Sequence, residues 1–333
     1  MKHRNRRLSR PWGAVCLLAI ALLSVCLGGC SGEVYSPNGE ALTLPPAVTE
    51  DPSGGSRPSS SNRPYEDAPH VLRADFLKTG KSDAILLQAD GTVILVDTGD
   101  ADDFSTISQC LREYGITEID YLIITHFDND HIGSAATVLQ NYGVKTVFLP
   151  DYIRDSSLYR RMMDALELLP EVEVRRVTET ITLEVGIGRV EIQPTALYEG
   201  GLTLGKDGEQ AEASGIVENN YSLITTVTFG QRSILLMGDA EKARIREYEA
   251  GLGGEARFDL IKIPHHGDSN KALREWLSRC EGLRYCVVHA EGPYEVDASL
   301  VSAVHDSGAV AYYTYDGWIQ FATDGESMSV LRG

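Results

Sequence analysis

Apolar and polar positions alternate in short runs through most of the chain after residue 70, and longer segments with helical spacing separate these runs. Short runs rich in Val, Ile, Leu and aromatic residues are typical of β-strands, whereas apolar residues three and four positions apart are typical of amphipathic helices. The pattern predicts strands over 71–78, 83–90, 92–99, 119–125, 145–150, 221–230, 233–239, 258–264, 284–290, 310–315 and 318–323. It predicts helices over 103–115, 134–143, 156–169, 240–250, 270–280 and 297–308.

The predicted elements fall into two halves, each of which mixes β-meanders with helices. A meander over 172–197, with a turn at "GIG", and a long acidic loop over 198–220 separate the two alternating regions. Since strands and helices must each bury one face against another layer, this order predicts two sheets packed face to face with helices outside. The predicted fold class is therefore α+β.

The N-terminal segment has a different pattern. "MKHRNRRLSR" is basic, and the apolar run "GAVCLLAIALLSVCL" is too short to span a bilayer comfortably. The run ends in "LGGC", which resembles the lipobox of bacterial lipoproteins. That resemblance implies a signal peptide over 1–29 and a lipidated Cys30, which anchors the protein to the membrane on the extracytoplasmic side. A plain N-terminal membrane anchor is the alternative, and it places the body of the protein on the same side.

Residues 30–68 are rich in Ser, Pro, Gly and Asn, which predicts a flexible tether before a folded domain over 69–333. The formal net charge is −18, and it becomes −23 when the five basic residues of 1–29 are removed. Such a surface repels nucleic acid as a whole, so a polyanion would need bound cations or a local basic patch. One compact basic cluster, formed by Arg154, Arg160 and Arg161, is the candidate patch, although a solvated helix face is the favoured explanation of it.

Potential metal ligands follow three of the predicted apolar strands. They are His126, Asp128, Asp130 and His131 in "THFDNDHIG", Asp239 in "LLMGD", and His265 and His266 in "IPHHG". Imidazole and carboxylate groups suit Zn²⁺, Mn²⁺ or Fe²⁺, and such groups are costly to bury without a partner. The alternative is that the aspartates only cap the following helix, which explains one aspartate but not the two flanking histidines.

These motifs resemble the metallo-β-lactamase superfamily, whose signature is HxHxDH followed by a distant Asp and a late His. Within that superfamily, "DFLKTGKSDAILLQADGTVILVDTG", "THFDNDHIGS", "NNYSLITTVTFGQRSILLMGD" and "IKIPHHGDS" are similar to the hydrolase domain of ComEC-type competence proteins. The similarity covers about 70–330. It implies an αββα four-layer sandwich, made of two packed mixed sheets with outer helices, and two divalent metal ions, zinc or manganese.

The resemblance also implies roles for individual residues. His126 and Asp128 would bind one metal, Asp130, His131 and His265 the other, and Asp239 would bridge the two. Asp130 and His131 are the expected catalytic residues, with Asp130 orienting or shuttling a proton. The other candidates stand close to the site: Asp97, which would brace the metal loop or satisfy turn amides; Asn219 and Asn220, which replace the superfamily's third histidine; and His266, which would contact substrate or lie in the core.

The implied reaction is hydrolysis by a hydroxide held between the metals, without a Ser or Cys nucleophile. A phosphodiester is the favoured bond, in DNA or in a cell-wall phosphodiester such as teichoic acid or phosphocholine. A lactone, thioester or β-lactam is the alternative substrate, although the missing third histidine argues against a zinc β-lactamase centre. A metal-stabilised binding module without turnover is a further alternative. No protein partner can be inferred from the sequence.

Overall fold

The computed structural model describes residues 34–35, 41–42, 65, 68–205, 216–254, 256–268 and 270–332. The expected signal peptide over 1–29, Cys30 and most of the expected tether over 30–68 lie outside the described residues. Within that tether, β1 (Val34–Tyr35) and β2 (Ala41–Leu42) form a small antiparallel pair. Among the described residues, no helix combines the length and the apolar character that a membrane span requires. All other elements belong to a second compact unit that contains residues 50–333.

The first sheet of this unit has eight strands in the order β19-β18-β3-β4-β5-β6-β7-β9. Its strands are β3 (Leu72–Phe76), β4 (Ile85–Ala89), β5 (Thr92–Val96), β6 (Glu118–Ile123), β7 (Gly143–Pro150), β9 (Glu173–Val177), β18 (Ile319–Thr323) and β19 (Met328–Arg332). Pairing is antiparallel from β19 to β5 and parallel from β5 to β9. The sequence pattern did not predict β19.

The second sheet has seven strands in the order β10-β11-β13-β14-β15-β16-β17. Its strands are β10 (Ile181–Val185), β11 (Gly188–Gln193), β13 (Ile224–Phe229), β14 (Arg232–Leu236), β15 (Leu260–Lys262), β16 (Tyr285–Val288) and β17 (Val310–Tyr313). The predicted meander is divided between the sheets, because β9 pairs with β7 whereas the β10–β11 hairpin begins the second sheet. A separate short pair, β8 (Tyr152–Arg154) with β12 (Leu202–Leu204), was not predicted.

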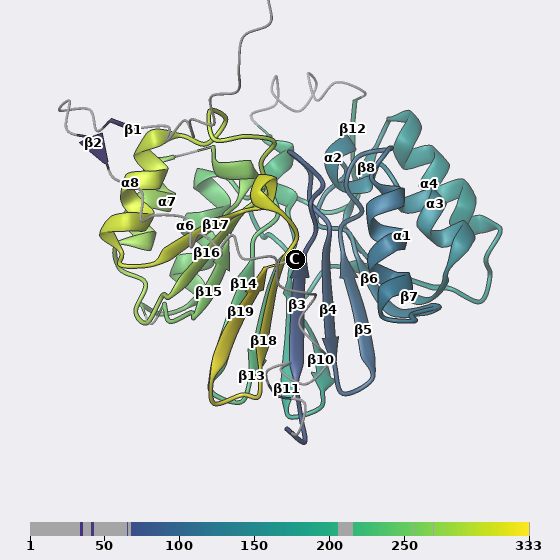
Figure 1. Ribbon diagram of the computed structural model, residues 1–333. Coiled ribbons are helices and arrows are strands. Elements are labelled where there is room, and N and C mark those ends of the chain that lie inside the picture. Colours follow the sequence, from purple (N-terminus) through teal and green to yellow (C-terminus); the bar gives the residue numbers. More distant parts are fainter. Residues whose placement is uncertain are drawn as a thin grey trace, which may run out of the picture. The chain divides into compact units, whose positions relative to one another are not determined.

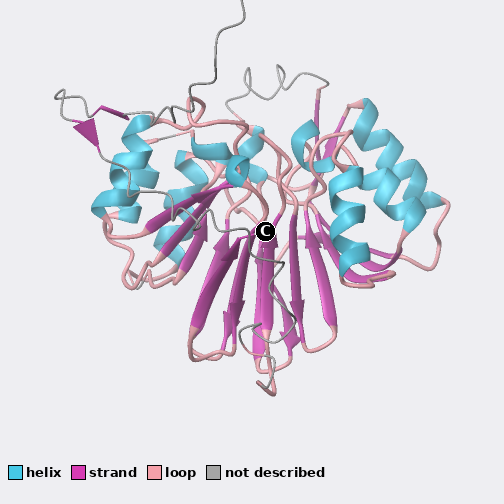
Figure 2. Ribbon diagram, in the orientation of Figure 1, coloured by secondary structure: helices cyan, strands magenta, loops and turns pink. Residues whose placement is uncertain are grey.

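Helices cover the outer faces of both sheets (Figures 1 and 2). Beside the first sheet lie α1 (Phe104–Glu113), α2 (Asn129–Ile132), α3 (Ala135–Asn141) and α4 (Ser157–Glu167). Beside the second sheet lie α6 (Lys242–Gly251), α7 (Lys271–Leu277) and α8 (Ala298–Asp306). Side-chain caps start several of them: Ser156 accepts a hydrogen bond from the Tyr159 amide, and Asn270 accepts one from the Leu273 amide.

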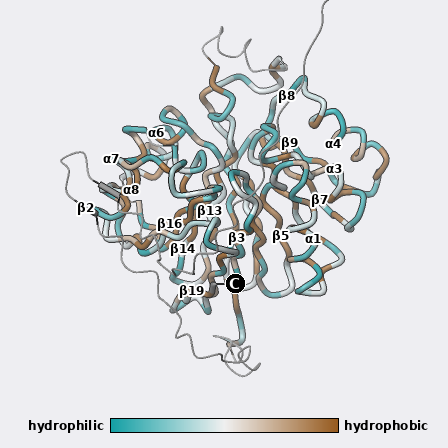
Figure 3. Tube along the Cα trace, turned by 45° about the horizontal axis from the view of Figure 1, so that its top comes forward, coloured by the Kyte–Doolittle hydropathy of each residue, from teal (hydrophilic) through white to brown (hydrophobic). Residues whose placement is uncertain are grey.

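Three hydrophobic clusters separate the four layers. One lies between the first sheet and its helices, one between the two sheets, and one between the second sheet and its helices. Representative members of these clusters are Ile107, Phe76 and Trp276 in turn. Apolar residues accordingly follow the strands along the Cα trace (Figure 3). This arrangement confirms the expected αββα sandwich.

The topology of the sheets determines where functional side chains can converge. β5 and β6 run parallel in the first sheet, and β14 and β15 run parallel in the second. The carboxyl ends of parallel neighbours meet at one edge of a sheet, and loops leaving such an edge are a common place for functional side chains. The motifs singled out from the sequence follow these four strands directly.

Candidate metal centre

A loop after β6 carries the first group of ligands, and Asp97 holds this loop in place. Asp97, which follows β5, accepts hydrogen bonds from the Thr125 amide at 2.8 Å and from its hydroxyl at 2.7 Å. The other side chain bound to Asp97 is His131, whose Nδ1 lies 2.7 Å from Asp97 Oδ2. A carboxylate on Nδ1 orients the ring and leaves Nε2 available for a metal. The bracing role expected for Asp97 therefore has a clear structural basis, beyond the satisfaction of turn amides.

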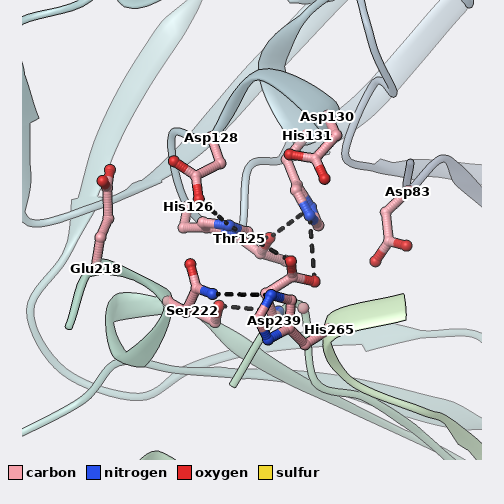
Figure 4. Close-up of polar contacts among 12 residues, drawn as sticks. Asp83, Thr125, His126, Asp128, Asp130, His131, Glu218, Ser222, Asp239 and His265 are labelled. Carbon is pink, nitrogen blue, oxygen red and sulfur yellow. Dashed lines mark hydrogen bonds and ion pairs between the residues drawn. The ribbon is translucent and has the colours of Figure 1, made fainter. Parts of the chain in front are cut away.

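The second sheet supplies a facing group after β14 and β15. Asp239 Oδ1 lies 3.2 Å from His131 Nε2, and Asp239 Oδ2 lies 3.3 Å from His266 Nε2. The Nε2 atom of His266 also lies 3.0 Å from Asp130 Oδ2. Asp130, His131, Asp239 and His266 thus place one ligand atom each within 4.8 Å of one another. In Figure 4, the labelled members of this group come from segments of both sheets.

The polar atoms of this cluster show what it is suited to hold. Nε2 of His126, His131 and His266 and Oδ1 of Asp239 are buried without a hydrogen bond from any described residue. Buried polar groups are normally paired, so a group of such atoms that converge needs an explanation. Imidazole nitrogens together with carboxylate oxygens are the donor set of divalent transition metals. The residues therefore fit a bound metal.

His126 and Asp128 form an adjoining pair. His126 Nε2 lies 3.5 Å from Asp128 Oδ2 and 4.0 Å from Asp239 Oδ2. Asp128 is the N-cap residue of α2, yet its side chain accepts no capping hydrogen bond. Instead Arg154 Nη1 donates to Asp128 Oδ1 at 3.1 Å, and Arg154 also pairs with Glu218. The cap-only explanation of this aspartate therefore fails.

The two adjacent histidines after β15 point to different places. His266 is buried in the cluster, whereas the His265 side chain is 30% exposed. Nε2 of His265 lies 3.4 Å from the Asn219 amide nitrogen, and its Nδ1 lies 3.8 Å from Glu241. The structure therefore brings His266 to the position expected for His265. Both residues have positive φ angles, 51° and 50°, and with this backbone the His265 ring lies at the exposed side whereas the His266 ring points inward.

The contacts of Asn220 give it a structural role. Its Oδ1 accepts hydrogen bonds from the amides of Glu241 and Arg244, at 3.1 and 3.2 Å. These donors lie at the start of α6, where backbone amides lack partners within the helix. Asn220 thus caps α6 and connects it to the loop before β13, while Asn219 faces the site near His265.

A second buried network contacts the cluster through Asp239 and His266. The sequence analysis did not single out this network. Asp83 pairs with Lys262, and its Oδ1 lies 3.2 Å from His289 Nδ1 and 3.7 Å from His266 Nδ1. The ammonium of Lys262 also lies 3.7 Å from Asp239 Oδ1 and donates to the Gly238 carbonyl at 3.1 Å. Lys262 is fully buried. A lysine in the middle of the apolar run "LIKIP" is the signal that could have revealed this network, since buried charges need partners.

The pKa values of the cluster reflect these close pairs. Burial alone would lower the pKa of His131, but Asp239 and Asp97 hold it well above its usual value. Burial alone would raise the pKa of Asp239, but His131 and His266 hold it well below. Burial alone would likewise lower the pKa of His266, but Asp239 and Asp130 raise it to about 9. Because an imidazole must lose its proton at the nitrogen that binds a metal, metal binding to this cluster would compete with protons.

Comparisons with known proteins agree with this geometry. The chain matches the metallo-beta-lactamase superfamily over residues 77–289. It is 25% identical over 175 residues to ComE operon protein 3 of Bacillus subtilis (strain 168), which covers 51% of this chain and 20% of that protein. It is 26% identical over 212 residues to Recombination protein 2 of Haemophilus influenzae, which covers 62% of this chain and 23% of that protein. These matches confirm the similarity to ComEC-type proteins, although the chain spans only about a fifth of the length of these relatives.

Two solved structures also align with this chain, at low sequence identity. The metallo-beta-lactamase fold protein YhfI from Bacillus subtilis aligns with 77% of this chain and 99% of its own, at 13% identity and a TM-score of 0.44. A diphosphatase of the PhnP family aligns with 74% of this chain and 86% of its own, at 16% identity and a TM-score of 0.39. The superfamily match covers well over half of the chain and contains four of the candidate ligands after β6 together with Asp239 and His266. The chain therefore belongs to the metallo-beta-lactamase superfamily, with a metal-binding site of the kind that this superfamily of metal-dependent hydrolases uses.

Proposed function

We propose that this protein is a metal-dependent phosphodiesterase or nuclease that is anchored to the outer side of the bacterial membrane through a lipid on Cys30. The observation that carries the catalytic part is the convergence, from both sheets, of buried imidazole and carboxylate atoms that lack a hydrogen-bond partner among the described residues. The anchor rests on the lipobox-like "LGGC" alone.

The charge of the site supports a pair of divalent cations. Asp130, His131, Asp239 and His266 would hold one cation, and His126 and Asp128, with Asp239 shared, offer ligands for the second. Ion pairs connect the ligands to a network of six acids and two permanently charged basic side chains. The net charge of these eight groups is −4, which two divalent cations would neutralise. The acids are Asp83, Asp97, Asp128, Asp130, Asp239 and Glu218, and the cations are Lys262 and Arg154.

The chain's own residues would prepare this site for hydrolysis. Bound divalent cations lower the pKa of water and neutralise charge that develops on a phosphate. Asp97 holds His131 with Nε2 facing inward, and Arg154 fixes Asp128. Asp130 is a partly exposed acid of the cluster and lies against His266, so it is placed to hold or pass a proton at the solvent side.

A phosphodiester is favoured because the donor set is rich in carboxylate oxygen. Oxygen donors prefer hard cations such as Mn²⁺, and hard cations in turn suit phosphate oxygens. The sequence has no histidine between His131 and His265, where the superfamily places the third imidazole of a zinc β-lactamase centre. Hydrolysis of a lactone, thioester or β-lactam remains the second candidate, because the cluster could polarise a carbonyl in the same way.

The test of the catalytic part is metal-dependent cleavage by the purified protein. Labelled single- and double-stranded DNA and bis(p-nitrophenyl) phosphate would be incubated with Mn²⁺ or Zn²⁺, with H131A as the inactive variant and H305A as a control on an exposed histidine. We expect cleavage that H131A abolishes and H305A retains. Metal-loaded protein that cleaves none of these substrates would contradict the proposal and favour carbonyl substrates.

The test of the anchor is independent of activity. We expect the protein to incorporate radiolabelled palmitate and to fractionate with membranes, and we expect C30S to lose the label. A wild-type protein without label would contradict lipidation at Cys30 but would leave the catalytic proposal intact.

A further inference from the structure

A cavity of about 610 Å³ lies beside the candidate metal centre. Its walls come from the first two turns of α6, from Asn220, and from Leu197 and Val217 in the chain that precedes it. Asn220 and Glu241 belong to both regions, since Asn220 caps α6 and Glu241 lies 3.8 Å from His265. The α6 helix begins three residues after Asp239, so the helical wall of the cavity starts close in sequence to the metal centre.

The acids that line the cavity are already engaged. Glu247 accepts hydrogen bonds from the Arg244 guanidinium at 2.7 Å, the Thr195 hydroxyl at 2.8 Å and the Ala196 amide at 2.6 Å. Glu241 lies beside His265 and 3.4 Å from the Asn219 amide nitrogen. Neither carboxylate is therefore available as the main partner of a cation in the cavity.

The cations that line the cavity are not engaged. Lys242 and Arg246 are exposed, and neither has a hydrogen bond or ion pair with another described residue. They are four positions apart on α6, so their side chains share one face of the helix. Two unpaired cations on one face, in a chain with a net charge of −18, form a local site for an anion.

The rest of the wall is apolar. Leu197 and Val217 are 39% and 37% exposed, although both are aliphatic. Together with Ala243 they form a surface against which a flat or apolar group would lose its contact with water. A ligand that suits this cavity therefore combines an anionic group with an apolar surface.

We propose that this cavity is a subsite for the nucleotide next to the scissile phosphodiester. Lys242 and Arg246 bind its phosphate, and its base rests on Leu197 and Val217. This inference deepens the proposed phosphodiesterase function and rests on it. It selects a nucleic acid strand over a polyol phosphate of the cell wall, because a polyol chain has no apolar face to place on the aliphatic wall.

The experiment compares two substrates that differ by one phosphate: the p-nitrophenyl ester of thymidine 5′-phosphate, with and without a 3′-phosphate. We expect wild-type protein to show a KM about tenfold lower for the 3′-phosphorylated ester, which corresponds to about 1.4 kcal/mol. The double variant K242A/R246A should lose this advantage and keep its KM for the unphosphorylated ester. R189A, which removes an exposed arginine from β11, should behave as wild type.

An unchanged preference in K242A/R246A, or an equal loss on both esters, would overturn the subsite. Since both residues are exposed, the variants should fold, and thermal unfolding checks that they do. If the metal-loaded protein hydrolyses neither ester, that result contradicts the proposed phosphodiesterase function, and the subsite is tested by binding. Fluorescence anisotropy with labelled pTpTpT then decides the subsite alone: we expect K242A/R246A to bind more weakly by about tenfold, and equal affinity would overturn it.

Discussion

Lys262 offers the sharpest test of how the metal centre is supported. Its ammonium lies between Asp83 and Asp239 with no access to solvent. K262M keeps the side-chain length and removes the charge. Two unit charges 4 Å apart interact by about 4 kcal/mol at an effective dielectric constant of 20, and breaking a buried pair typically costs about 3–5 kcal/mol. We therefore expect metal-free K262M to lose about 3–5 kcal/mol of unfolding free energy.

Metal binding should change in the opposite direction. Because the removed cation lies 3.7 Å from Asp239, its loss leaves more negative charge to attract a metal. A ligand that binds only the folded state stabilises it in proportion to the logarithm of its concentration over its dissociation constant. Mn²⁺ should therefore raise the unfolding free energy of K262M more than that of wild type, and calorimetric titration should give a lower dissociation constant.

Urea unfolding followed by tryptophan fluorescence measures these differences, with D83N and the double variant D83N/K262M as controls. The two side chains interact directly, so the double variant should be more stable than the sum of the single losses predicts, by about 2 kcal/mol or more. Losses that add within about 0.5 kcal/mol would refute the reasoning, because they would show that the pair does not act as a unit. Weaker metal binding by K262M would refute the electrostatic part.

The other predictions concern single sites. In calorimetric titration, H266A should weaken metal binding by about 100-fold, whereas H265A should weaken it by no more than a few-fold, because only His266 lies in the cluster. Burial raises the pKa of Asp75 from 3.8 to about 6, above its unfolded value, so its contribution lowers stability as pH rises from about 4 to about 6. D75N should remove that slope and add at most about 3 kcal/mol at pH 7, as thermal unfolding at several pH values would show. A Cβ on Gly133 would lie 2.3 Å from the Asp100 carbonyl carbon, so G133A should cost about 3 kcal/mol in urea unfolding. An unchanged midpoint in G133A would contradict this close packing.

The contiguous part of the site could be predicted from the sequence. His126, Asp128, Asp130 and His131 follow one apolar strand within six positions, so local spacing is enough to bring them together. Asp239 and the two histidines after β15 come from other strands, but their place at strand ends made the convergence of these segments predictable. Periodicity likewise predicted most strands and every helix on the two sheets except α2.

Other features depend on tertiary context that spacing does not contain. His265 and His266 are adjacent and alike in sequence, and only the folded structure, in which both have positive φ, shows that the His266 ring is the one in the cluster. Asp83 and Lys262 belong to different sheets, so their pairing depends on how the sheets pack. The β9 strand has the pattern of a meander strand, yet its partner is β7 in the first sheet. The β8 and β12 strands have three residues each, too few to show a period.

The division of the ligands between two sheets has a consequence for folding. Asp130 and His131 come from the first sheet, and Asp239 and His266 come from the second, more than 100 positions later in the chain. Contacts between distant segments form late, since closing long loops costs entropy before any contact repays it. Neither half can complete the cluster by itself. The cation would therefore enter last, after the two halves have packed against each other.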